Sequence, residues 1–267
     1  MVSQLQKIAS KGEVSPVSSI EETVIYPDCD GNPMSDNTKQ FRWIVTIKEN
    51  LEILFANDPA VFIAGDLLWY PVEGNNKIRQ APDAMVVFGR PKGDRGSYQQ
   101  WKEDNIAPQV AFEVLSPGNR SSEMMRKLLF YQKYGVEEYY IYDPDDNELT
   151  GWLAESGEFV EIADMQGWQS PRLQIRFELD DETLNLYTPQ GDRFLTPVEL
   201  ATQRDEERAR ADAEQRRADA EQQRADAEQQ RADAEQQRAN DAEARARQLE
   251  EQLRSMGIDP GKLDRAS

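Results

Sequence analysis

The stretch VAFEVL, residues 110–115, constrains the fold of this chain more than any other. Its side chains alternate between two faces, and both faces are apolar apart from Glu113. A strand that is apolar on both faces is typical of the centre of a sheet covered on each side. Burying an unpaired carboxylate there costs several kcal/mol, very roughly. Glu113 therefore needs a partner, either structural or functional.

The segments around this stretch favour a mixed sheet flanked by helices. A helix with Thr38 as its N-cap and a stop at 57–59 is followed by short strands, then by a second helix from Ser121 or Ser122 to about Tyr134. The expected strands are 61–64, 82–88, 110–115 and 137–143, with a later hairpin around Ser156-Gly157. This order predicts an α/β fold with a mixed sheet whose central strands are covered on both faces.

Composition divides the chain into four expected regions. These are an N-terminal arm (1–37), an α/β domain (38–198), a helix built on a heptad repeat (199–256) and a flexible C-terminus (257–267).

A seven-residue repeat covers residues 210–237, as RADAEQR followed by three copies of RADAEQQ, and 201–253 contain no Gly, Pro or aromatic residue. A seven-residue period is typical of a left-handed coiled coil, but its only apolar residue here is alanine. After Asn240, the residues Leu249 and Leu253 belong to a more regular apolar seam. Two interpretations stay open: a solvated single helix, or a weak stalk that joins copies of the chain into a homo-oligomer such as a dimer.

The charge and the missing residue types exclude several classes of function. The chain has 31 Lys and Arg against 50 Asp and Glu, a formal net charge of −19. Nucleic acid could then bind only through a local basic patch or through divalent cations. With 0 His, a Ser-His-Asp triad, a Cys-His pair and a His-ligated zinc site are excluded. The single Cys29, the lack of an apolar span and the polar N-terminus predict a cytoplasmic protein with no membrane partner.

Three carboxylates are attached to three consecutive β segments: Asp66, Asp83 and Glu113. If these segments are neighbours in the sheet, the three groups converge, and clustered carboxylates repel one another. A divalent cation removes that repulsion, and hard oxygen ligands suit Mg²⁺ or Mn²⁺. Such an ion can polarise a phosphoryl oxygen and generate hydroxide.

Each of these residues also has a structural interpretation. Glu113 could pair with an arginine, and Asp66 and Asp83 could be turn residues that accept backbone N–H bonds; the candidate arginines are Arg79, Arg120 and Arg126. Lys127 lies on the apolar face of the second helix, which is unusual for lysine. It could instead form an ordinary surface pair with Glu123, four residues earlier.

The motifs PD (82–83) and EVLSP (113–117), followed by Lys127, Tyr131 and GVEEYY (135–140), resemble the Uma2 family of endonucleases. This family lies within the restriction-endonuclease-like PD-(D/E)xK superfamily, and the resemblance spans residues 38–198. It implies a mixed sheet flanked by helices and metal-dependent cleavage of phosphodiester bonds.

By position, the resemblance implies that Asp83 and Glu113 are metal ligands, assisted by the Val114 carbonyl. Asp66 would be a further acidic ligand or would support the ligands, and Lys127 would orient or activate the attacking water. The superfamily pattern has lysine two residues after the glutamate, where this chain has Leu115. Lys127 must therefore reach the site from the following helix, and the first helix has no histidine where relatives often carry one.

Two functions of different class follow from the sequence. The first is a Mg²⁺- or Mn²⁺-dependent endonuclease acting on DNA, and the second is an inactive nuclease fold that serves as a binding or scaffold protein. For the nuclease, six basic residues could contact phosphate, although they could equally be solvated surface: Arg90, Lys92, Arg95, Lys102, Arg120 and Lys133. Tyr98 and Trp101 could stack on bases or pack in the core. A two-carboxylate glycosidase is disfavoured, because no aromatic-rich sugar cleft is identifiable.

Overall fold

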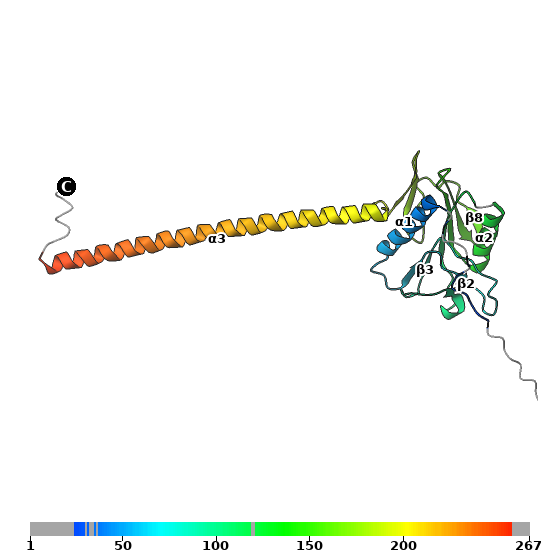
Figure 1. The fold of residues 1–267 in the computed structure, drawn as a ribbon, viewed down its shortest axis with the longest axis horizontal. Helices are drawn as coiled ribbons and strands as arrows, with labels where there is room; N and C mark the ends of the chain where they lie inside the picture. The colour runs from blue at the N-terminus through cyan, green and yellow to red at the C-terminus, as the bar shows by residue number, and fades with distance from the viewer. Residues whose placement is uncertain (1–23, 30, 32–34, 36, 119–120, 258–267) are drawn as a thin grey trace, which may run out of the picture. The chain divides into compact units, whose positions relative to one another are not determined.

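A computed structural model describes residues 24–29, 31, 35, 37–118 and 121–257 (Figure 1). The chain divides into two compact units, one ending at Pro197 and one beginning at Val198. Most of the expected N-terminal arm, and all but the first residue of the expected flexible C-terminus, lie outside the described residues.

The first unit is built on a six-stranded sheet in the order β1-β3-β5-β6-β7-β8. Only the β5–β6 pair is parallel, so the sheet is mixed, as expected. The strands are β1 (Val61–Ala64), β3 (Ala84–Phe88), β5 (Val110–Val114), β6 (Glu138–Asp143), β7 (Glu148–Glu155) and β8 (Glu158–Glu161). The α/β fold class is confirmed, and β5 is an interior strand between β3 and β6.

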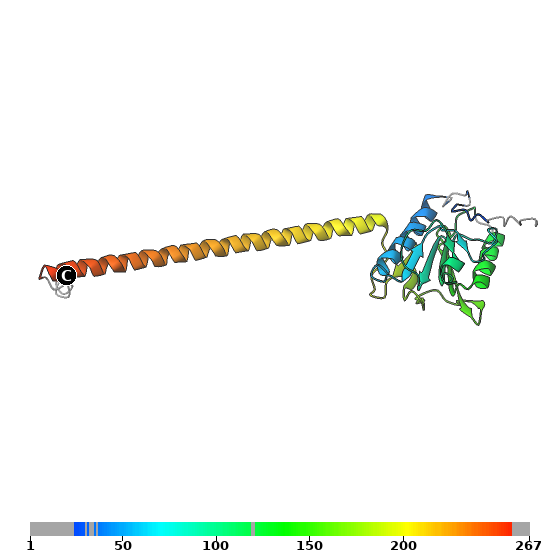
Figure 2. The ribbon, with the colours of Figure 1, turned by 90° about the horizontal axis from the view of Figure 1, so that it is seen from below.

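Two helices cover opposite faces of this sheet (Figure 2): α1 (Thr38–Leu54) and α2 (Ser121–Tyr134). The N-cap of α1 is Asn37 rather than the expected Thr38. The Asn37 side chain accepts hydrogen bonds from the backbone N–H groups of Lys39 and Gln40, at 2.9 and 2.8 Å. An Asn cap satisfies donors that the first turn leaves free.

Strand alternation separates two apolar cores. On the α1 side, Val110, Phe112 and Val114 of β5 pack in one cluster with the hairpin of β9 (Arg176–Leu179) and β10 (Leu184–Tyr187). On the α2 side, Ala111 packs in the other cluster with the short parallel pair β2 (Trp69–Tyr70) and β4 (Tyr98–Gln99), which leads into the 3₁₀ helix η1 (Gln100–Lys102). Glu113 follows the same alternation as Ala111, so its side chain lies on the α2 face.

The expected hairpin is the turn between β7 and β8. Ser156 and Gly157 both have positive φ, at 54° and 88°. Two consecutive left-handed residues are typical of a type I′ turn, whose twist matches that of the flanking strands.

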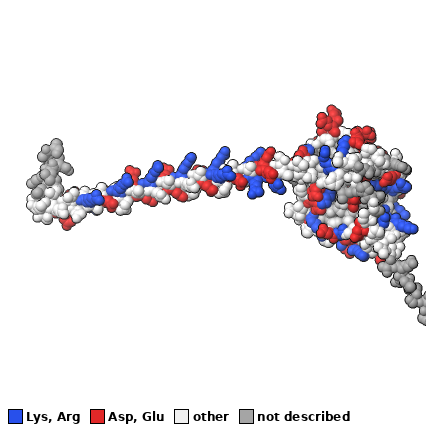
Figure 3. Space-filling view, in the orientation of Figure 1, with Lys and Arg blue, Asp and Glu red and all other residues white. Residues whose placement is uncertain are grey.

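The second unit consists of the long helix α3 (Pro197–Ser255), none of whose residues is buried. Glutamine side chains along the repeat donate to the acidic side chain four residues later, as in Gln215–Asp219 and Gln222–Asp226, both at 2.8 Å. Figure 3 shows Lys and Arg interspersed with Asp and Glu along this helix. No helix in the described ranges is both long and apolar enough to cross a bilayer.

Candidate active site

The pairing of β3 with β5 brings two acidic residues together. Ala84 is the Cα partner of Phe112, and continuing this antiparallel register by one residue sets Asp83 opposite Glu113. Directly opposed residues point to the same face and have their Cβ atoms about 5 Å apart. Like charges in that position repel each other, so the sheet carries an electrostatic cost at this point.

Glu113 is 2% exposed, and both of its carboxylate oxygens are hydrogen-bonded by side chains of α2. Lys127 Nζ donates to Oε2 at 2.7 Å, and the Tyr131 hydroxyl donates to Oε1 at 2.5 Å. The cationic partner in the part of the chain that the structure describes is therefore Lys127, and not Arg79 or Arg126. Arg120, the third arginine considered above, lies outside the described residues. Lys127 and Tyr131 are four residues apart, so one helix face presents both donors to the glutamate.

Asp83 lies just before β3 and is 9% exposed. Its Oδ2 accepts the backbone N–H of Val114 at 2.7 Å. Burial, and then the charge of Glu113, raise the pKa of Asp83 well above its usual value. Lys127 and the Val114 N–H oppose this rise without cancelling it. The single lysine therefore does not offset the cost of ionising both carboxylates.

Burial on its own would lower the pKa of Lys127. The charges of Glu113 and Asp83 outweigh burial, and the pKa of Lys127 is raised. Glu123, the alternative partner, contributes less than either of these two carboxylates. Lys127 is thus a fixed cation of the cluster rather than a solvated residue of the helix surface.

Asp66 lies beside this cluster but is exposed. Its backbone N–H donates to the Pro82 carbonyl at 3.1 Å, and a Cβ added at Gly65 would lie 3.3 Å from the Asp83 carbonyl oxygen, so the two chain segments pass very close. The charge of Asp66 is the smallest contribution to the raised pKa of Asp83. Among the described residues, no three His, Cys, Asp or Glu side chains form a group able to hold a metal. Asp66 therefore joins the site through its charge rather than as a third clustered carboxylate.

The Val114 carbonyl accepts a hydrogen bond from Gln40 Nε2 of α1 at 2.8 Å. Gln40 is buried, and it was not among the residues predicted for the site. A signal was present, because Gln40 precedes Ile44, Ile47 and Leu51 at helical spacing on the buried face of α1. A polar residue at that position needs a buried partner, which here is the carbonyl expected to assist metal binding.

One further hydroxyl close to the two carboxylates lacks a partner. The Tyr139 hydroxyl is buried, and nothing in the part of the chain that the structure describes hydrogen-bonds to it. Burial raises its pKa, and so do the charges of Glu113 and Asp83. A buried polar atom without a partner is rare and suits a site that binds a further polar ligand, such as water.

Three of the basic residues expected to contact phosphate lie in the loop that follows β3 and are paired with acidic side chains. Lys102 forms no ion pair among the described residues, and Arg120 lies outside them. Arg90 and Arg95 both bond to Glu103, at 2.8 and 2.7 Å, and Lys92 lies 3.5 Å from Glu52. These cations already have acidic partners.

Of the two aromatic residues of the same region, Tyr98 is fully buried and its hydroxyl donates to the Ile106 carbonyl at 2.7 Å. Tyr98 is therefore a core residue. Trp101 packs on Tyr26, with ring centroids 4.8 Å apart.

The chain was compared with known proteins. The family model Uma2, described as "Putative restriction endonuclease", matches residues 30–180. A crystal structure of "a putative nuclease belonging to DUF820 from Anabaena variabilis ATCC 29413" is similar at 14% identity and a TM-score of 0.39, covering 51% of this chain and 73% of that one. The comparison with curated proteins gave no match. Since the family model covers more than half of the sequence, the chain belongs to the Uma2 family of restriction-endonuclease-type nucleases.

Proposed function

We propose that this protein is a metal-dependent endonuclease that hydrolyses phosphodiester bonds of DNA with Mg²⁺ or Mn²⁺. One observation carries the proposal: Asp83 and Glu113 are buried opposite each other, and their mutual repulsion helps to raise the pKa of Asp83. A fold gains no stability from opposing two buried acids. A bound divalent cation gives the arrangement a purpose.

The donors of the site fit such an ion. Asp83 and Glu113 would supply carboxylate oxygens, and the Val114 carbonyl would supply a neutral oxygen. Mg²⁺ prefers oxygen ligands, takes one or two carboxylates and keeps several waters, so two acids suffice. When bound, the ion would polarise a phosphoryl oxygen and acidify a water molecule. The unpartnered Tyr139 hydroxyl supports a water beside these groups.

Lys127 would then provide positive charge to the phosphate. Its raised pKa keeps the amine protonated, so it is suited to donate hydrogen bonds and unsuited to act as a general base. A buried ammonium group stabilises the negative charge that develops on a phosphate during hydrolysis. Tyr131 and Lys127 together would hold the Glu113 carboxylate in one orientation. Gln40 would do the same for the Val114 carbonyl.

A specific observation favours a second candidate, a nucleic-acid-binding protein without nuclease activity. Both oxygens of Glu113 already have donors, and Lys127 occupies one of them at 2.7 Å. This closed arrangement satisfies Glu113 without an ion.

Incubation of the purified protein with plasmid DNA, single-stranded DNA and RNA separates the two candidates. Each substrate is tested with Mg²⁺, with Mn²⁺ and with EDTA. If the protein is a nuclease, it should cleave a substrate only when the metal is present, and the Asp83→Asn variant should not cleave it. Binding without cleavage under every condition would instead support the inactive protein.

A further inference from the structure

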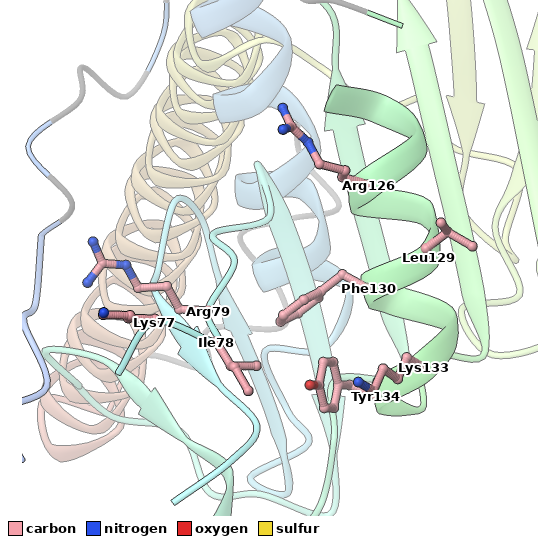
Figure 4. A pocket seen from close by; sticks show the side chains of 8 residues that line it. All are labelled: Lys77, Ile78, Arg79, Arg126, Leu129, Phe130, Lys133 and Tyr134. Atoms are coloured by element: carbon pink, nitrogen blue, oxygen red, sulfur yellow. The ribbon is translucent and has the colours of Figure 1, made fainter. Parts of the chain in front are cut away.

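A basic pocket lies between α2 and residues 77–79 of the loop that joins β2 to β3 (Figure 4). Its volume is about 390 Å³, which is within the size range of small-ligand sites. Four cationic side chains line it, and no acidic side chain does: Lys77, Arg79, Arg126 and Lys133. The chain as a whole has a net charge of −19, so a pocket lined by four cations and no acid differs sharply in charge from the rest of the molecule.

These four cations differ from those of the loop after β3. Within the described ranges, none of the four forms an ion pair with an acidic side chain. The Arg79 guanidinium instead lies 3.5 Å from the neutral hydroxyl of Tyr70. Because nothing in this part of the chain neutralises them, the four charges remain available to an anionic ligand.

Two aromatic rings complete the pocket. Phe130 and Tyr134 of α2 lie 4.7 Å apart between ring centroids, and both contact the buried Trp69. The Lys133 ammonium is 5.2 Å from the centroid of the Tyr134 ring. Packing on Trp69 fixes the rings in place, so that a planar ligand group could contact them at little entropic cost. Cations beside aromatic rings are the combination by which proteins hold unpaired nucleotides.

The pocket and the candidate active site share α2. Arg126 directly precedes Lys127, and Phe130 directly precedes Tyr131, so these two pocket residues are each about 100° around the helix from a residue that contacts Glu113. A nucleic-acid strand with one phosphate at the active site could therefore continue along α2 into the pocket.

We propose that this pocket binds an unpaired nucleotide segment of the strand held at the active site. The four cations contact phosphates, and Phe130 and Tyr134 contact a base. The inference rests on the proposed function for the identity of the polymer. It goes further by placing the strand on α2 and by favouring single-stranded over duplex nucleic acid.

The test is fluorescence anisotropy with the full-length protein in EDTA, so that binding is measured without cleavage. The probes are a labelled oligothymidine of about 15 nucleotides, near the upper end of common single-strand site sizes, and a duplex of the same length. The pocket variant Arg126→Gln/Lys133→Gln is compared with Arg42→Gln/Arg217→Gln. The control pair is exposed, lies outside the pocket and removes the same charge.

The wild-type protein is expected to bind oligothymidine more tightly than the duplex. The pocket variant should lose about tenfold in affinity, and its salt dependence should become less steep by about 1.4 in the log–log slope, because two cations are removed. The control pair should lose much less. A Tyr134→Leu variant, which keeps an apolar contact with Trp69, should also bind more weakly, because it removes the ring.

Equal losses in the pocket and control variants would overturn the proposal, as would duplex binding at least as tight as single-strand binding. Absence of binding to either probe would overturn it as well. The failure of this proposal can be distinguished from the failure of the proposed function. If the wild-type protein cleaves DNA with Mg²⁺ but the pocket variant binds oligothymidine normally, only the proposed role of the pocket is wrong.

Discussion

Two buried glutamates lie on opposite faces of the same sheet, and their surroundings differ. Glu113 on the α2 face contacts a lysine and a tyrosine and lies opposite a second acid, Asp83. Glu138 on the α1 face is only 1% exposed and accepts hydrogen bonds from neutral groups. Its donors are the Tyr140 hydroxyl at 2.9 Å, the Arg172 backbone N–H at 2.6 Å and the Ser170 hydroxyl.

The difference shows how to separate a structural carboxylate from a candidate functional one. Glu138 fixes the segment around Ser170 and Arg172 to the edge of β6, so its burial is matched by contacts that hold the fold together. Glu113 and Asp83 add repulsion to burial, and removing the charge of Asp83 would relieve the fold. Features that cost stability without a structural gain are expected at functional sites.

The largest effect is expected for Asp83→Asn. Metal-dependent cleavage should fall by at least about a hundredfold, because even residues that only support metal ligands cost 10–100-fold when mutated. The free energy of unfolding in EDTA should be unchanged or higher, since a buried repulsive charge is lost. Initial rates on plasmid DNA and urea unfolding measure the two effects.

Glu138→Gln is the matched control, a buried acid on the other face. Its cleavage rate should be that of the wild type, while its free energy of unfolding should be about 1–3 kcal/mol lower through mismatched hydrogen bonds. If the two variants showed the reverse pattern, the assignment of roles to the two acids would be wrong.

Lys127→Gln should affect both activity and stability. It leaves Glu113 buried without its cation, and breaking a buried pair costs about 3–5 kcal/mol. Cleavage should fall by about 10²-fold through the loss of positive charge at the phosphate. The exposed Lys102→Gln should change stability by less than about 0.5 kcal/mol. An equally stable Lys127→Gln protein would show that the pair with Glu113 does not persist in solution.

A pH series should show a smaller effect at Glu138. Burial raises its pKa above the usual 4.5, in spite of the hydrogen bonds it accepts from Ser170 and the Arg172 N–H and of the charge of Arg172. The folded state then binds the proton more tightly than the unfolded state. The stability of the wild type relative to Glu138→Gln should therefore fall as the pH rises above 4.5 through the raised pKa. Urea unfolding of both proteins in EDTA checks this slope, and a rising difference would contradict it.

Removal of residues 199–267 should leave both glutamates undisturbed. Cleavage and the thermal unfolding of the first unit should stay the same, because α3 forms a separate unit without buried residues. The helical circular dichroism should drop strongly. Light scattering of the two forms decides between the single helix and the oligomerisation stalk, since only the stalk predicts a loss of oligomers on truncation.

The period of apolar residues made much of the fold predictable. Alternation in β5 located an interior strand, and helical spacing located α1 and α2. The sequence predicted that Asp83 and Glu113 lie close together only if their strands are neighbours in the sheet. Strand order depends on tertiary pairing, so the sequence alone could not establish that condition. The residue pattern alone could not reveal which cation reaches Glu113, since an arginine and a lysine at similar chain distances are alike without the direction of α2. Only the family resemblance implied Lys127.

Glu138 was not recognised as buried, although it stands at the start of the apolar run EYYIY. Two of its hydrogen-bond donors belong to Ser170 and Arg172, far along the chain, and no local sequence pattern predicts these contacts. The same limit applies to the basic residues. Arg90 and Lys133 look equivalent in sequence, but of the two only Arg90 has an acidic partner among the residues that the structure describes.

The central claim is that Asp83 and Glu113 share a divalent cation. Anomalous diffraction from a crystal soaked in manganese tests it most directly, because it reports binding independently of activity. The account predicts an anomalous peak between the two carboxylates and the Val114 carbonyl that is absent from Asp83→Asn crystals. A soaked wild-type crystal with no peak there, and with Lys127 still bonded to Glu113, would contradict it.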